Sequence, residues 1–225
     1  MRMKRTSPKY RDSLIAAAFC WAIACTLLAT FPSAMAEVES DADRRLAGLQ
    51  GWLDATVDLS GRFEQELLSG ALGTGIEENG EFSLVRPGKL RFDYLQPERK
   101  IAIVNGSSTV FWVEEEDQTT FGELAAEDDL LSVLLIGNRP LVELFRASID
   151  VEPVARGRYR LRLVPLDEGQ TLTELILTLR EKGDALEAVE VLDISGNRML
   201  YRFPKMQRNR GIPPERFLWK QAPGQ

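Results

Sequence analysis

The residues that could perform catalytic chemistry are few in this 225-residue sequence. Histidine is absent, which removes Ser-His-Asp and Cys-His catalysis and most transition-metal sites. Both cysteines, Cys20 and Cys25, lie in an apolar stretch near the N-terminus, so the rest of the chain has neither a thiol nucleophile nor a disulfide. Acid–base chemistry by paired carboxylates is what remains.

Three acidic runs could supply such carboxylates: Glu77-Glu78, residues 114–117 and residues 127–129. Acid–base catalysis needs a carboxyl group in a desolvating pocket beside a second, differently tuned one. The first two runs adjoin expected turns, and the third precedes an expected helix, where acidic residues favour the helix dipole. We therefore expect a protein that is not an enzyme, with no metal site and no cofactor.

Arg86 is the charged residue most clearly set up for a specific role. It stands at the end of an expected strand, and Pro87 after it biases its backbone toward an extended conformation. Such an arginine is held in place by the strand rather than carried on a loose loop. A surface salt bridge with a carboxylate at a strand end is the alternative interpretation.

Alternating residues on both sides of the turn at 86–88 predict two strands that share one apolar face. Lys89, Arg91 and Asp93 alternate with that face and point to the opposite side. The apolar face consists of Phe82, Leu84, Leu90, Phe92 and Tyr94.

The remaining pattern predicts about eleven strands in a meander. Helical spacing predicts one amphipathic helix over 43–57, and two short apolar helical pieces follow at 130–136 and 141–147. We expect a mainly β fold with α elements (α+β), in which one curved antiparallel sheet carries the helices against its concave face. The expected strands are residues 59–67, 79–85, 89–94, 100–104, 108–114, 149–151, 159–164, 172–180, 185–193, 199–205 and 216–220.

A curved sheet covered only by short helices can enclose space as well as fill it. A plain packed core is the alternative for the same apolar side chains. The residues expected to line a hydrophobic cavity are Phe63, Phe82, Leu84, Leu90, Phe92, Tyr94, Phe111, Leu131, Leu134, Leu135, Leu144 and Phe145.

Residues 1–36 have the pattern of a secretory signal peptide. A basic start runs into the apolar residues 14–31, and Ala34-Met35-Ala36 offers a small-residue cleavage site. A retained membrane anchor and a lipid-attachment site at Cys25 are the alternatives. Cleavage would leave one domain over 37–225 that is more acidic than the full chain, whose net charge is −6, so nucleic acid is not an expected partner.

A set of short motifs occurs in one order along the chain and resembles the periplasmic outer-membrane lipoprotein carrier proteins of the LolA type. No single motif is diagnostic, but together they extend over nearly all of residues 37–225. The motifs are the helix at residues 46–57, Phe63-Glu-Gln65, Gly80-Glu-Phe82, Val85-Arg-Pro87, Leu90-Arg-Phe92, Gln96-Pro97, Ile103-Val-Asn-Gly106, Val110-Phe-Trp112, Pro214-Glu-Arg-Phe217 and Pro223-Gly224.

The resemblance implies an unclosed half-barrel of about eleven strands with an α-helical lid over a hydrophobic cavity. It implies a monomer in the periplasm that receives the acyl chains of lipoproteins. The donor would be the inner-membrane lipoprotein-releasing ABC transporter and the acceptor would lie at the outer membrane. Arg86 matches the family position that bonds to the lid and gates the cavity.

Three other functions stay open at this stage. Relatives with this fold carry other lipids, so the chain could be a LolA-like carrier or sensor of another amphiphile, such as a glycolipid or a fatty acyl precursor. A periplasmic enzyme acting on lipid or envelope polymer is disfavoured by the missing histidine. A membrane-tethered scaffold would retain residues 1–36.

Overall fold

The computed structural model describes residues 40–69, 75–123, 134–167, 171–183 and 185–220. The expected signal peptide, residues 1–36, and the expected cavity residue Leu131 lie outside the described residues.

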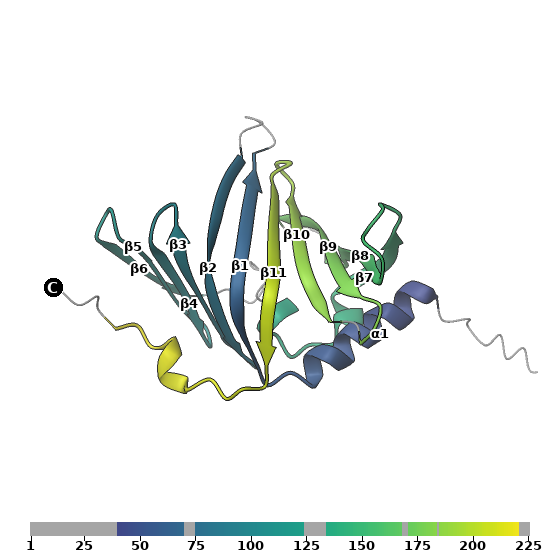
Figure 1. Cartoon of the computed structure of the whole chain (residues 1–225), viewed down its shortest axis with the longest axis horizontal. Helices are drawn as coiled ribbons and strands as arrows, with labels where there is room; N and C mark the ends of the chain where they lie inside the picture. Colours follow the sequence, from purple (N-terminus) through teal and green to yellow (C-terminus); the bar gives the residue numbers. More distant parts are fainter. Residues whose placement is uncertain (1–39, 70–74, 124–133, 168–170, 184, 221–225) are drawn as a thin grey trace, which may run out of the picture. The chain divides into compact units, whose positions relative to one another are not determined.

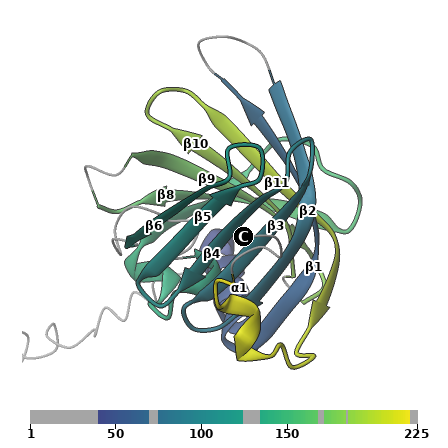
Figure 2. The same ribbon diagram turned by 90° about the vertical axis from the view of Figure 1, so that its left-hand side faces the viewer.

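One antiparallel sheet of 11 strands dominates the structure, as Figure 1 shows, and the expected fold class is confirmed. The strand order is β6-β5-β4-β3-β2-β1-β11-β10-β9-β8-β7, so only β1 and β11 are neighbours that are distant in sequence. β1 and β11 therefore join two meandering arms, one of which faces the viewer in Figure 2. The strands are β1 (Asp58–Leu68), β2 (Gly75–Val85), β3 (Lys89–Gln96), β4 (Lys100–Asn105), β5 (Ser108–Val113), β6 (Gln118–Glu123), β7 (Phe145–Asp150), β8 (Arg158–Pro165), β9 (Leu172–Arg180), β10 (Leu186–Asp193) and β11 (Arg198–Arg208).

The amphipathic helix forms as α1 (Asp41–Asp54) and packs against β7 and β8. Ser40 and Asp43 close a capping box at its N-terminus, which satisfies backbone donors that a helix otherwise leaves free. Its apolar stripe joins the core of the sheet because helical spacing places these residues on one side. The stripe consists of Ala42, Leu46, Leu49 and Leu53.

The second short helical piece was predicted too long. Only Leu141–Glu143 forms a 3-10 helix, η1, and β7 begins at Phe145. Ala147 pairs with Leu163 of β8, so edge pairing to an existing strand overrides the helical pattern of this apolar run.

Two strand predictions were wrong in opposite directions, which left the total unchanged. β6 was missed because its sequence, QTTFGE, is mostly polar and shows little alternation. Residues 216–220 form no strand, since Pro214–Phe217 is a 3-10 helix, η2, against β3 and β4. Phe217 is buried there, and Trp219 lies beside Trp112, so these aromatic residues pack on the outer face instead of joining the sheet.

Two glycines lie next to irregularities in strand pairing, where a bulge bends the strand. The register shifts between Arg62 and Glu64 on β1 and between Asn79 and Gly80 on β2. A Cβ atom on Gly61 would lie 2.1 Å from the Lys205 carbonyl oxygen, and one on Gly80 would lie 2.0 Å from the Asp93 carbonyl oxygen. The bend therefore requires residues without a side chain.

Gly80→Ala is expected to lower the free energy of unfolding by about 1–3 kcal/mol, because the new methyl group overlaps backbone that cannot move alone. Gly51→Ala is the matched control, since a Cβ there meets nothing within 4 Å. It should stabilise the helix by about 0.5–1 kcal/mol. Urea denaturation of both variants measures the difference, and equal stability of the two would contradict the assignment of the bend.

Candidate binding site on the concave face

The concave face of the sheet is built from cross-strand neighbours whose side chains point the same way. Phe82 on β2 lies opposite Phe92 on β3, and Phe92 lies opposite Ala102 on β4. The ring of Phe63 on β1 packs edge to face on Phe92, with centroids 4.9 Å apart and planes at 84°. Phe203 of β11 adds a ring 5.1 Å from Phe82. The centre of this face is therefore aromatic.

The described residues expected to line the cavity fall into three groups. Tyr94 and Leu144 are half-buried and pack against the core, whereas Phe111 lies outside the core cluster and is 43% exposed. The register puts Phe111 opposite Ala102, so it extends the concave face toward an open edge. The residues that belong to one buried core are Phe63, Phe82, Leu84, Leu90, Phe92, Leu134, Leu135 and Phe145.

The apolar groups of α1 and of the lid segment, residues 134–137, pack into the same core as the sheet. Residues 134–136 are helical, and Leu134, Leu135 and Ile136 are each buried. In this arrangement the lid side chains themselves cover the concave apolar face. An acyl chain would have to displace them, so the hydrophobic cavity stays a prediction.

The side chain of Arg86 binds backbone carbonyl groups of the lid segment. Its Nη1 donates to the carbonyl oxygens of Leu135 at 2.7 Å and Leu134 at 3.3 Å, and its Nη2 donates to that of Gly137 at 2.6 Å. We call these three hydrogen bonds the latch. The last carbonyls of a helical turn have no partner within the helix, and a guanidinium group is a strong donor for them.

The guanidinium group of Arg86 is half-buried, so its charge depends on nearby polar groups for compensation. Burial lowers the pKa of the Arg86 guanidinium below its usual value, and the negative charge of Asp54 acts in the opposite direction. A half-buried cation loses hydration, so the lid carbonyls that replace water are needed to offset the cost. A further backbone bond, from Gly88 N to the Ile136 carbonyl at 3.0 Å, joins the same turn to the lid.

The concave face also holds a polar group that the sequence pattern did not reveal. Glu77 and Glu78 were expected beside a turn, but both lie inside β2, because that strand begins at Gly75. Glu78 pairs with Gln65 of β1, which is buried on the side of Phe63. Its position in the strand, two residues from Gly80, was the available signal.

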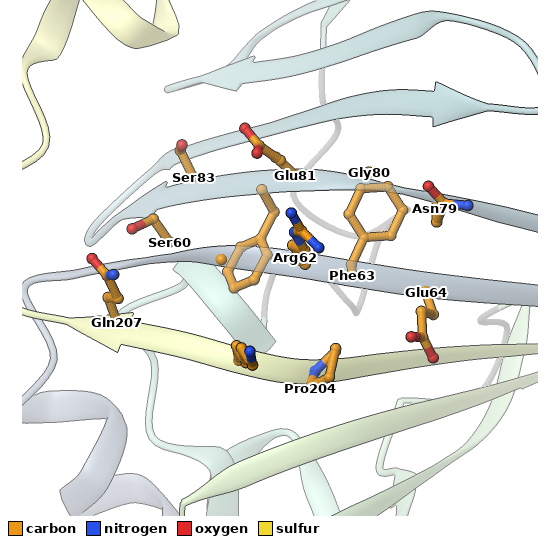
Figure 3. Close-up of a pocket in the computed structure, with 13 residues that line it drawn as sticks. Ser60, Arg62, Phe63, Glu64, Asn79, Gly80, Glu81, Ser83, Pro204 and Gln207 are labelled. Atoms are coloured by element: carbon orange, nitrogen blue, oxygen red, sulfur yellow. The ribbon is translucent and has the colours of Figure 1, made fainter.

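An open pocket of about 730 Å³ lies on the outer face of the sheet, across β1, β2 and β11 (Figure 3). Its polar side chains alternate with the aromatic residues of the concave face, so the strand register sets it on the opposite side. Arg62, Glu64 and Glu81 give it charges of both signs. It shares no surface with the latch.

Within the described ranges, His, Cys, Asp and Glu form no group of three that could hold a metal ion. No helix in those ranges is long and apolar enough to cross a membrane.

This geometry defines a class of fold: an open antiparallel half-barrel with a lid segment bound over its concave face. The family model described as outer membrane lipoprotein carrier protein LolA matches residues 55–220. The chain therefore belongs to the LolA family of outer-membrane lipoprotein carrier proteins.

Sequence relatives match over nearly their full lengths. An outer-membrane lipoprotein carrier protein of Methylococcus capsulatus is 26% identical and covers 96% of this chain and 96% of its own. Another such carrier protein, from Cupriavidus pinatubonensis, is also 26% identical, and the match covers 86% of this chain and 90% of the relative's length. Among solved structures, MucB has a TM-score of 0.50 at 16% identity, covering 80% of this chain and 63% of its own, which supports the fold alone.

Arg86→Leu should weaken the attachment of the lid. Loss of hydrogen bonds from a charged donor costs about 1.5–3 kcal/mol, which raises the open fraction about ten- to a hundredfold. Hydrogen exchange at the Gly88 amide, which donates to Ile136 of the lid, measures this opening. The Gly106 amide is the internal control, because it donates to the Gly88 carbonyl and not to the lid. Unchanged exchange at Gly88 would show that Arg86 does not hold the lid.

Proposed function

We propose that this protein is a periplasmic carrier that shields the acyl chains of lipoproteins on its concave face and moves them from the inner to the outer membrane. Membership of the LolA family supports the carrier role. The observation that carries the proposal is the wide apolar concave face, which is covered by a lid segment held through a few hydrogen bonds at one end.

The physical problem of such transport is the exposure of hydrocarbon to water. Burial of each acyl CH₂ group is favourable by about 0.8 kcal/mol, so a multiply acylated protein does not leave a membrane unshielded. The aromatic and leucine side chains of the concave face offer an equivalent apolar environment. If the lid segment moved aside, the acyl chains would take over the contacts that the lid side chains now make.

Release is the opposing requirement, and the latch provides for it. A closed, empty state that is stabilised by Arg86 reduces net affinity, because binding must draw on the open form. The latch therefore lowers the free energy needed to return cargo to a membrane. We propose an inner-membrane lipoprotein-releasing ABC transporter as the donor and an outer-membrane acceptor as the recipient, with the carrier acting as a monomer.

The proposed activity is binding and not catalysis. The sequence lacks histidine, and Glu78, an acidic residue that lies opposite Gln65 on the concave face, is paired with Lys100. Mass spectrometry of lipids and proteins that co-purify with the carrier from the periplasm tests the cargo. Acylated lipoproteins are the expected result, whereas a glycolipid or a free fatty acyl precursor would assign the alternative function.

Arg86→Leu is expected to bind acylated lipoprotein about tenfold more tightly or more, because it removes the stabilisation of the closed state. In a transfer assay from loaded carrier to outer-membrane vesicles, this variant should retain its cargo. Arg139→Leu is the matched control, since that exposed side chain contacts Glu143 at 4.0 Å and not the lid carbonyls. Normal delivery by Arg86→Leu would refute the gating role.

A further inference from the structure

A chain of polar side chains crosses the concave face at the end of the sheet remote from Arg86. The Tyr94 hydroxyl donates to the Gln65 Oε1 at 3.0 Å, and the Gln65 Nε2 donates to the Glu78 Oε2 at 3.4 Å. Lys100 forms an ion pair with the other oxygen of Glu78. These four residues, which we call the polar belt, come from β1, β2, β3 and β4.

The polar belt lies between the aromatic centre and solvent. The ring of Tyr94 packs against Phe63 with centroids 5.0 Å apart, and the Lys100 ammonium lies 5.2 Å from the Tyr94 centroid. Gln65 is buried, whereas Tyr94 and Lys100 are half-buried. One side of the belt is thus apolar and the other is partly open.

Latch and belt are separated along the strands. Asp58, which pairs with the residue before Arg86, and Gln65 are seven residues apart on β1, which corresponds to about 23 Å at the usual rise of a strand. The belt lies toward the arrowhead of β1 in Figure 1, and the latch lies toward the start of that strand. The concave face is therefore apolar over most of its length and polar at the end remote from the latch.

Stability alone does not account for an ion pair in this position. The side chains of Glu78 and Lys100 are only 11% and 19% exposed. Removing two charges from water costs free energy that their attraction often fails to recover, and well-packed apolar residues would serve a core at least as well. A purely hydrocarbon-binding face would also gain from apolar residues here.

The belt offers neutral hydrogen bonding and little net charge. The charges of Glu78 and Lys100 compensate each other, so the belt does not select a strongly anionic head group. Burial and the charge of Glu78 raise the pKa of the Tyr94 phenol above its usual value, which keeps its hydroxyl protonated as a donor. An amide, an ammonium group and a phenol are the donors that could turn toward a carbonyl oxygen.

Given the proposed carrier function, we propose that Gln65, Tyr94 and Lys100 form a recognition site for the ester carbonyls that join acyl chains to a head group. Glu78 positions two of them through its hydrogen bond to Gln65 and its ion pair with Lys100. Acyl chains lie along the aromatic part of the concave face. Their carbonyl oxygens accept hydrogen bonds from the belt donors, which give up bonds that they now make to one another. The head group then lies toward solvent.

The test compares two probes that differ only in their ester carbonyls. One is a synthetic triacylated cysteinyl peptide, and the other is the same peptide with each ester replaced by an ether. Both are titrated against the purified protein by displacement of an environment-sensitive hydrophobic dye. The wild-type protein should bind the ester probe about tenfold more tightly, as expected for one or two additional hydrogen bonds.

Tyr94→Phe and Gln65→Leu should each bring this preference to within about twofold while affinity for the ether probe stays constant. Two variants are used so that a folding defect in one, detected by thermal denaturation, leaves the other as the test. Tyr159→Phe is the matched control, because it removes a hydroxyl from the same core outside the belt, and it should keep the wild-type preference.

Equal wild-type affinity for both probes would overturn the recognition site and leave the carrier function intact. An equal loss of affinity for both probes in a folded variant would also overturn the recognition site, since the belt would then act only in packing. Failure of the wild-type protein to bind either probe would reject the carrier function, and the recognition site with it.

Discussion

The hydrogen bonds from one guanidinium group to the carbonyls of the lid segment are the interaction on which the proposed carrier cycle depends. Arg86 has a fixed place because it ends β2 directly before the turn into β3. The lid turn presents the carbonyls of Leu135 and Gly137, which a helix leaves free at its end. Attachment through so few bonds covers an apolar surface, and the proposed carrier function requires these bonds to be exchanged for ligand contacts.

The same constraint explains how the concave face can be a core and a candidate binding surface. Leu49 and Leu53 of α1 and Leu134 of the lid segment are almost fully buried against the sheet. Apolar packing has no directional requirement, so the proposed function needs only that hydrocarbon chains take over the contacts of these side chains. Gly61 and Gly80 contribute by allowing neighbouring backbone to approach closely beside the irregularities in strand pairing.

Much of the fold follows from residue alternation, because burial of one face imposes a period of two. That pattern placed Phe82, Leu84, Leu90 and Phe92 together, and they share one buried cluster. It failed where tertiary contacts decide the outcome: β6 has a polar sequence, and Trp219 packs on Trp112 outside the sheet. Glu78 was misplaced because the expected strand began at residue 79, whereas β2 begins four residues earlier, at Gly75.

In the proposed function, acyl chains occupy the concave face after the lid segment is displaced. Photocrosslinking with a lipopeptide that carries a photoreactive group within its acyl chain, followed by peptide mass spectrometry, tests this occupancy most directly. The expected result is crosslinks to concave residues such as Leu84, Leu90 and Phe92, whose side chains belong to the buried cluster. Crosslinks confined to the outer pocket around Ser60 and Ser83 in Figure 3 would contradict it.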